Sequence, residues 1–415
     1  MTSAAGRGFN CWRVIVKNLQ QRQSQKCYQR TCCTRSNGVD HAAIQALCRK
    51  LATTIVEPVA AQVDRDAKYP SEQIAKLGEH GLMGMTAPPE YGGAGLDMTS
   101  VSIAVEELSR SCASTGCIVS IHNALYVDLL VTRGSEHQKE LYLKPYTRCL
   151  PGSFALSESE AGSDVANMST TAVKKGDCYV LNGIKTWTTS AKQADVAIVF
   201  ATVDRNLKHR GITAFLVPLK AKGVHLGKED KKLGIRGTST CTINLCDVEV
   251  PCENVVGEIG GGFKIAMEQL NKARIGIASQ ALGISQAALD TAIKYAIERR
   301  AFGKHLKDIQ AVKMRLARMA AQIEASRLLV RKAAALCDKG EPFLKNSAIA
   351  KLTASETANF CANQCIQILG GRGYVNDMPA ERYFRDARVT EIYGGVSDIQ
   401  MMVIAGEILS EFAKT

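Results

Sequence analysis

The strongest constraint on the fold of this chain is a hydrophobic pattern that changes twice along its length. From about Asp40 to Leu150, stretches such as IQALCRKLATTIVEPVAAQV and VSIAVEELSRS carry apolar residues three and four positions apart, which predicts helices. The Gly/Pro-rich run APPEYGGAGLD predicts a loop between them. From about Pro151 to Val256 short β-branched runs predict strands, and helical spacing returns after the glycine-rich loop at 257–262.

This order predicts an α+β protein with a helical domain at 38–150, a β-domain at 151–258 and a C-terminal helical bundle at 259–415. The strand runs VAIVFATV and ITAFLVP have no helical segment between them, which favours an antiparallel sheet or barrel. Asn182-Gly183 separates two strand-like runs and predicts a two-residue hairpin turn. Gly340 and Gly370 stand where helix C-caps are expected.

The first 39 residues differ from the rest because they contain seven basic side chains and no acidic one. The whole chain has a formal charge of +12, so only about +5 remains outside this segment, and nucleic-acid binding is not favoured. An Arg-rich, acid-free leader with an amphipathic start predicts a mitochondrial presequence at residues 1–37 and hence a location in the matrix. A disordered basic arm is the alternative.

The composition, with 46% apolar and 22% charged residues, is that of a globular enzyme. No apolar run approaches the ~20 residues that a membrane-spanning helix needs. The eleven cysteines outside the leader are an odd number and include no CxxC, which favours reduced thiols over disulfides or a metal site. Cys112, Cys117, Cys361 and Cys365 fit small apolar core positions on predicted helices.

Seven blocks of sequence resemble the acyl-CoA dehydrogenase family. In chain order they are YGGAGLD, FALSESEAGSD, KLGIRGTST, FKIAMEQLNKARIGIASQALG, ERRAFG, QILGGRGY and RDARVTEIYGGVSDIQ. The chain is similar to this family from roughly residue 40 onward, and most similar to its short-chain members. The resemblance implies FAD as cofactor, a short-chain acyl-CoA substrate, electron-transferring flavoprotein as electron acceptor, and a homotetramer.

The resemblance also implies which residues meet the cofactor. In the flavin and thioester region these are Phe154, Leu156, Ser157, Gly162 and Ser163, with Trp187 and Thr189 on the other side of the ring. Positions that meet the FAD of a neighbouring subunit are Arg299, Phe302 and Gln310, and those near its adenosine half are Gln367, Gly370 and Gly371. Val396 and Asp398 stand at cofactor positions where the family has threonine and glutamate. The plainer alternatives are a Ser-rich turn, a core tryptophan, a solvated arginine and a helix cap.

The substrate positions implied by the resemblance are Ser163, Asn271, Arg274 and Gly395. Arg274 matches an arginine that helps to position the acyl-CoA ligand. Asn271 stands where short-chain members tend to have aspartate, so hydrogen-bonding capacity is kept and the charge is lost.

Gly394 stands where the family has its catalytic glutamate. In the family this carboxylate removes the α-proton while the β-hydrogen leaves as hydride, and the backbone N–H at the same position polarises the thioester oxygen. Gly394 keeps the N–H and loses the carboxylate, and the second place where relatives carry the base is Ala273 here. A positioned general base contributes roughly 10²–10⁴-fold to the rate. Glu391 is a candidate substitute, provided that the Gly394-Gly395 loop re-forms.

Two hypotheses follow from this loss. One is FAD-dependent α,β-dehydrogenation of short-chain acyl-CoA thioesters, in fatty-acid β-oxidation or branched amino-acid breakdown, with impaired activity. The alternative is a non-catalytic paralogue that binds FAD and acyl-CoA and acts as a scaffold or assembly protein.

Overall fold

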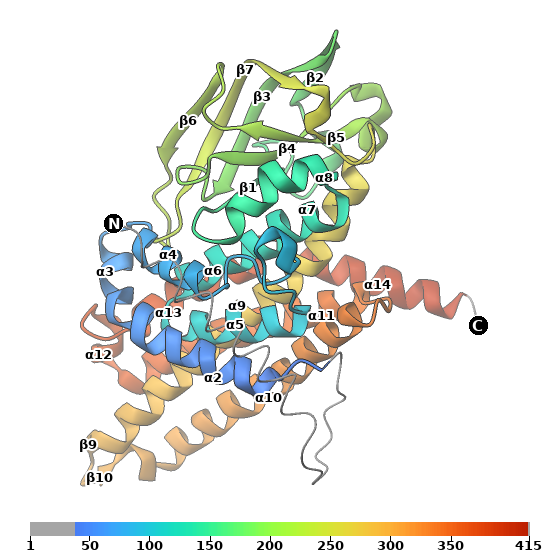
Figure 1. Ribbon diagram of the computed structural model, residues 1–415. Helices are drawn as coiled ribbons and strands as arrows, with labels where there is room; N and C mark the ends of the chain where they lie inside the picture. The colour runs from blue at the N-terminus through green and yellow to red at the C-terminus, as the bar shows by residue number, and fades with distance from the viewer. Residues whose placement is uncertain (1–37, 414–415) are drawn as a thin grey trace.

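A computed structural model describes residues 38–413, so the predicted presequence lies outside the described residues. Helices precede and follow a β-sheet along the chain. Figure 1 shows the sheet at one end of the molecule, with the helices stacked beneath it. The predicted order of N-terminal helices, β-domain and C-terminal helices is therefore confirmed.

The N-terminal part is helical, and carboxylates begin two of its helices. Its α-helices are α2 (His41–Leu51), α3 (Ala60–Arg65), α4 (Ser71–Glu79), α5 (Met98–Ser111), α6 (Ala113–Ile121), α7 (Asp128–Arg133) and α8 (Glu136–Gln138). The Asp40 carboxylate accepts a hydrogen bond from the N–H of Ala43 at 3.0 Å, and Asp97 accepts one from Ser100 at 2.8 Å. These bonds satisfy N–H groups that have no partner within the helix.

One stretch of the described chain, Ala113–Arg133, is long and apolar enough to cross a membrane by length and composition. The stretch is not an uninterrupted apolar run, because it contains His122, Asn123 and Asp128. Of its most apolar window, 89% is buried inside the protein. A helix that is apolar on all sides is also what the core of a soluble protein contains.

The middle part is a single eight-stranded sheet in the order β6-β7-β3-β2-β4-β5-β8, with β1 paired to β4. Its strands are β1 (Ser153–Ala155), β2 (Thr171–Lys175), β3 (Cys178–Thr189), β4 (Val196–Thr202), β5 (Ile212–Pro218), β6 (Val224–Glu229), β7 (Thr240–Pro251) and β8 (Val255–Val256). β1 and β2 run parallel to β4, and the other neighbouring pairs are antiparallel. The sheet is mixed and open, which corrects the predicted antiparallel sheet or barrel. The local pattern of a strand carries no information about the direction of a partner far away in the chain.

The predicted hairpin turn is also in the wrong place. Asn182 and Gly183 lie inside β3, where the register against β7 shifts by a bulge. The two-residue turn is Gly176-Asp177, between β2 and β3, and Gly176 has a φ of 58°. Glycine is needed at position 183 because a Cβ there would lie 2.4 Å from the hydroxyl of Thr170. The Asn-Gly pair thus marks a bulge here instead of a turn.

The C-terminal part is a helical bundle around one long helix. It contains α9 (Gly262–Glu298), the small hairpin β9 (Arg300–Ala301) and β10 (Lys304–His305), α10 (Gln310–Asp338), α11 (Leu344–Leu369), α12 (Gly371–Tyr374), α13 (Ala380–Arg388) and α14 (Ser397–Phe412). Gly340 follows α10 with a φ of 68°, and Gly370 ends α11 with a φ of 61°, so both predicted caps are confirmed.

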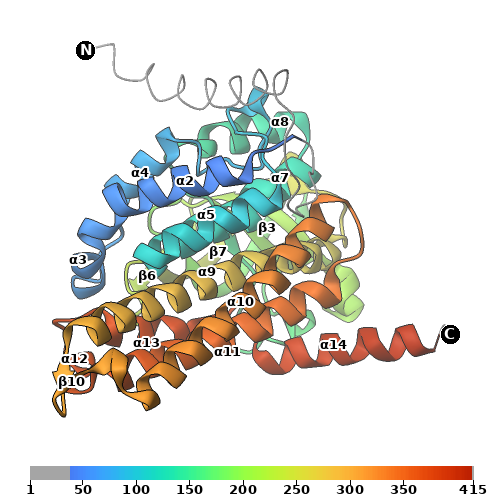
Figure 2. The same ribbon diagram turned by 90° about the horizontal axis from the view of Figure 1, so that it is seen from below.

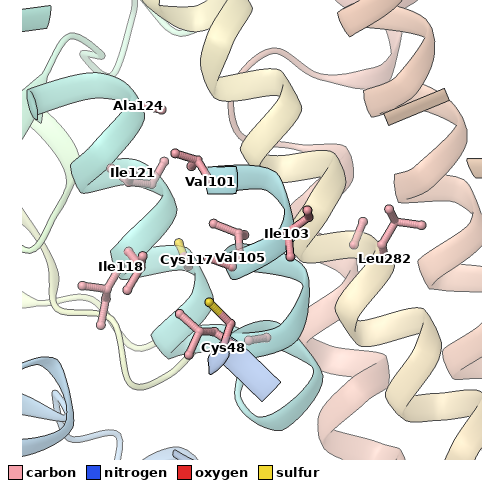
Figure 3. Close-up of a cluster of buried hydrophobic side chains, with 14 of the residues drawn as sticks. Cys48, Val101, Ile103, Val105, Cys117, Ile118, Ile121, Ala124 and Leu282 are labelled. Carbon is pink, nitrogen blue, oxygen red and sulfur yellow. The ribbon is translucent and has the colours of Figure 1, made fainter. Parts of the chain in front are cut away.

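α9 forms the centre of the core. It packs against α5, α10, α11 and α13, and Figure 2 shows α2, α5, α9, α10 and α11 side by side. A Cβ at Gly283 would lie 2.4 Å from the Glu106 carbonyl oxygen, so this glycine lets α9 approach α5 closely. Figure 3 shows apolar side chains of α2, α5, α6 and α9 meeting in one cluster that includes Cys48, Cys117 and Leu282. Cys112, Cys361 and Cys365 are buried as well, as predicted.

Candidate active site

The residues predicted to line the flavin region come together where the segment after β1 meets β3. The N–H of Thr186 donates to the carbonyl of Ser157 at 2.9 Å, and the hydroxyl of Ser153 donates to the carbonyl of Thr189 at 3.0 Å. This pairing places Phe154, Leu156 and Ser157 beside Trp187 and Thr189. Gly162 and Ser163 lie further along the same segment and are exposed.

A buried ion pair, which the sequence reasoning missed, anchors this segment. The Nζ of Lys185, on β3, donates to Glu158 at 2.7 Å and to the carbonyl of Leu156 at 3.0 Å. The Glu158 carboxylate also accepts hydrogen bonds from the N–H groups of Ser169 and Thr170, at 2.5 and 3.0 Å. Burial opposes ionisation of Glu158, but Lys185 and these bonds lower its pKa to about 2. The only sequence signal was a lysine inside a strand run.

Trp187 is exposed although it is the only tryptophan in the described part of the chain. Its side chain is 58% exposed, and its φ of 55° lies in the left-handed region. The hydroxyls of the adjacent Thr186 and Thr188 are buried and have no partner in the described protein. The exposed ring of Trp187 provides a surface on which a flat ligand can stack, and the hydroxyls of Thr186 and Thr188 provide hydrogen bonds for its polar edge. These residues therefore fit a flavin ring.

The residues predicted to meet the FAD of a neighbouring subunit form a separate group at the β9–β10 end of the bundle (Figure 1). Arg299, Gly370 and Gly371 line one surface depression of about 620 Å³. No atom lies within 4 Å of a Cβ built at either glycine, so the backbone is accessible there. Phe302 is 95% exposed, and Gln310 is exposed. Gln367 is exposed near the end of α11. Within one chain these residues do not meet the flavin-region group.

The loop at Gly394-Gly395, just before α14, is held by two buried side chains. Gly394 has a φ of 65° and Gly395 a φ of 95°. The amide nitrogen of Gln400 donates to the Gly395 carbonyl at 2.8 Å, and the Nζ of Lys351 donates to the same oxygen at 2.7 Å. Val396 begins the first turn of α14, and Asp398 is exposed on that turn.

Lys351 was also missed by the sequence reasoning. It lies on the buried face of α11 with Ser347, Ala354 and Ala358, and its side chain is completely buried. Burial lowers its pKa to about 8, repulsion from Arg274 adds to this, and Glu391 opposes it. A lysine at helical spacing within a stripe of small residues was the available signal.

Arg274 lies on α9 and is only 6% exposed. One guanidinium nitrogen donates to the side-chain oxygen of Asn271 at 2.8 Å, and the Nε has no partner in the described protein. Burial lowers the pKa of Arg274 to about 10. The predicted substrate residues Asn271 and Arg274 therefore do lie together.

The two positions at which the resemblance predicts a base are Gly394 and Ala273, and neither carries a carboxylate. A Cβ at Gly394 would lie 2.3 Å from the Cδ1 of Ile277, so the tip of this buried side chain fills the space. Ala273 is buried on α9. Glu391 is ion-paired with Arg388 on the preceding turn. The described residues also contain no group of three or more His, Cys, Asp or Glu that could hold a metal ion.

Comparison with known proteins assigns this architecture to a family. Residues 39–149, 153–248 and 260–409 match the N-terminal, middle and C-terminal domains of acyl-CoA dehydrogenase. The chain belongs to the acyl-CoA dehydrogenase family.

Two curated relatives are short-chain enzymes by name. The mitochondrial short-chain specific acyl-CoA dehydrogenase of Mus musculus is 51% identical over 373 residues, which cover 90% of each chain. The short-chain specific acyl-CoA dehydrogenase of Clostridium acetobutylicum is 43% identical and covers 88% of this chain and 97% of that one.

Two solved structures have the same fold. Butyryl-CoA dehydrogenase from Megasphaera elsdenii is 38% identical, with a TM-score of 0.88 over 91% of this chain and 100% of that one. A chain in a structure of the electron transferring flavoprotein of Acidaminococcus fermentans is 39% identical, with a TM-score of 0.89 over the same shares. Members of the family are FAD-dependent oxidoreductases.

Proposed function

We propose that this protein binds FAD and a short-chain acyl-CoA thioester, and that it dehydrogenates the thioester only at a strongly reduced rate. The observation that carries the proposal is Gly394, where the chain keeps the backbone N–H and has no carboxylate. The identity to short-chain relatives supports the substrate class.

FAD, when bound, would act as the oxidant that accepts the β-hydrogen of the acyl chain as hydride. Trp187 and Thr189 hold the ring, Arg274 and Asn271 orient the ligand, and the N–H of Gly394 polarises the thioester oxygen. One such donor is typically worth about 3 kcal/mol of transition-state stabilisation. Lys351 and Gln400 act on the same loop, because both fix the carbonyl of Gly395. The missing function is removal of the α-proton.

The separate residue group at the β9–β10 hairpin supports a cofactor site that is completed between subunits. In this proposal Arg299 of one chain meets the pyrophosphate of a cofactor held mainly by its neighbour, within a homotetramer. The guanidinium fork suits a diphosphate because it donates two parallel hydrogen bonds. Electron-transferring flavoprotein accepts the electrons, and the mitochondrial names of the mammalian relatives support a matrix location.

A non-catalytic role is the second candidate, and one observation favours it. The Cδ1 of Ile277 lies 2.3 Å from the position of a Cβ at residue 394, so a side chain there would require the tip of Ile277 to move. A protein that keeps the FAD and acyl-CoA contacts without turnover would act as a scaffold or assembly protein.

Anaerobic mixing of the FAD-loaded protein with butyryl-CoA separates these candidates. The proposal predicts that the flavin absorbance band shifts on binding and bleaches slowly. Bleaching within seconds would mean that a substitute base exists, and a Glu391→Gln variant would then identify or exclude Glu391. A shift without any bleaching supports the non-catalytic role. Protein that takes up no FAD would contradict both.

A further inference from the structure

Two buried cations lie near Gly394, and neither is ion-paired with a carboxylate in residues 38–413. Lys351 is completely buried and Arg274 is 6% exposed. Lys351 contacts the Gly395 carbonyl, and Arg274 lies on α9 three residues before Ile277, whose Cδ1 faces Gly394, so both cations lie near this glycine. Repulsion from Arg274 contributes to the lowered pKa of Lys351. Within residues 38–413 neither side chain has a carboxylate within ion-pair distance. Their polar contacts are neutral, because Lys351 donates to the carbonyl of Gly395 and Arg274 donates to the amide of Asn271.

The nearest anionic group does not compensate both charges. In the described part of the chain, Glu391 is the carboxylate that raises the pKa of Lys351, and it is already ion-paired with Arg388. The Nε of Arg274 is buried and has no hydrogen-bond partner among residues 38–413. A buried charge is costly unless it is paired and hydrogen-bonded, so this pair of cations favours the entry of an anion.

We propose that Arg274 and Lys351 form an anion subsite beside Gly394, and that it takes a carboxylate carried on the α-carbon of an acyl thioester. The inference rests on the proposed function, since it assumes that an acyl-CoA ligand presents its α-carbon to Gly394. The ligand class is then the 2-carboxyacyl thioesters.

The surroundings of residue 394 explain why the ligand, and not the chain, supplies the carboxylate. A side chain at this position needs a Cβ, and that Cβ would lie 2.3 Å from the tip of Ile277. Its backbone would also be strained, because the φ of Gly394 is 65°. A carboxylate that belongs to the ligand needs neither this Cβ nor this backbone.

Calorimetric titration of the FAD-loaded protein tests the subsite without depending on turnover. The matched probes are 2-carboxybutyryl-CoA and butyryl-CoA, which differ only in the α-carboxylate. We expect the carboxylated ligand to bind about ten-fold tighter or better, as is typical of a desolvated charge contact. Equal or weaker binding of 2-carboxybutyryl-CoA would overturn the inference. If neither thioester bound, the proposed function itself would fail, and the subsite with it.

Three variants test which side chains cause the preference for 2-carboxybutyryl-CoA over butyryl-CoA. Arg274→Gln and Lys351→Met should each abolish it, whereas Arg315→Gln, an exposed arginine on α10, should retain it. The Gly395 carbonyl keeps the Gln400 donor at 2.8 Å in Lys351→Met, so the loop retains a hydrogen bond. A preference that survives in both test variants would contradict the assignment.

Two further probes test where the carboxylate is carried. Succinyl-CoA, whose carboxylate is at the far end of the acyl chain, should show no gain over butyryl-CoA, and an equal gain would overturn the α-carbon placement. Acetate should compete with 2-carboxybutyryl-CoA and leave butyryl-CoA binding unchanged. Acetate binding without any preference between the thioesters would contradict a ligand-borne carboxylate.

Discussion

The ammonium group of Lys351 lies 2.7 Å from the carbonyl oxygen of Gly395 and donates a hydrogen bond to it from a completely buried position. This contact joins the N-terminal third of α11 to the loop that carries Gly394. The loop is thus held by a side chain from a distant part of the chain.

Lys351 should make stability depend on pH in the alkaline range. Burial lowers its pKa to about 8 from 10.5, so between these values the unfolded chain binds a proton that the folded chain has released. Stability from this group therefore rises with pH through the window from 8 to 10.5, by at most about 3 kcal/mol. Urea unfolding should show that Lys351→Met removes this rise. The control Lys345→Met changes an exposed ion pair with Glu411 and should keep the rise; the same slope in both variants would contradict the prediction.

The Glu158–Lys185 ion pair should be essential for the stability of the segment after β1, which carries the predicted flavin-binding residues Leu156 and Ser157. Removing one partner leaves the other buried and unpaired, so Glu158→Gln and Lys185→Met should each cost about 3–5 kcal/mol and reduce the FAD content. The double variant should cost less than the sum of the two, because the unpaired charge is gone. Glu72→Gln, in an exposed pair with Lys76, is the control and should change little. Additive losses measured by denaturant unfolding would argue against coupling.

Sequence patterns found the helical regions and the strands β4 and β5 because these depend on local spacing. β5 has the predicted bounds, and β4 ends one residue before the predicted run. The patterns failed where the structure depends on contacts between segments distant in the sequence. Examples are the parallel pairing of β1 with β4 and the bulge at Gly183. The glycine at position 394, where the resemblance predicts a glutamate, was visible in the sequence. The tip of Ile277 beside it was not, because it depends on how α9 packs against the loop.

His122 should cause acid lability. Its Nδ1 accepts a hydrogen bond from the N–H of Gly152 at 3.0 Å, and its Nε2 donates to the carbonyl of Tyr146 at 2.9 Å. Burial lowers its pKa to about 4, so the unfolded chain binds a proton between pH 6.5 and 4 and the folded chain does not. About 3 kcal/mol of stability should be lost as the pH falls through this window.

The matched variant is His122→Gln, whose amide has both an acceptor and a donor for these two backbone groups and does not titrate. Its stability should depend less on pH between 6.5 and 4 than that of the wild type. Identical pH profiles in chemical denaturation would rule out this role for His122.

Arg299 should be needed for FAD retention if the cofactor site crosses between subunits. Arg299→Gln removes the guanidinium from the depression that also contains Gly370 and Gly371, so FAD content should fall. Arg300→Gln, at the next position, is the matched control and should retain FAD. The flavin-to-protein absorbance ratio after gel filtration measures the outcome. Equal FAD content in both variants would remove Arg299 from the site.

The most direct test of the account is to restore the carboxylate in a Gly394→Glu variant. The FAD-loaded variant is mixed anaerobically with butyryl-CoA beside the wild type and Gly394→Gln, which has the same size and no base. Adding Ile277→Val to both variants removes the Cδ1 atom that a Cβ at residue 394 would meet. We predict that glutamate accelerates flavin bleaching by roughly 10²–10⁴-fold over glutamine, as expected for a positioned general base. Wild-type protein that bleaches as fast as Gly394→Glu, or a glutamate variant that binds butyryl-CoA and bleaches no faster than glutamine, would contradict it.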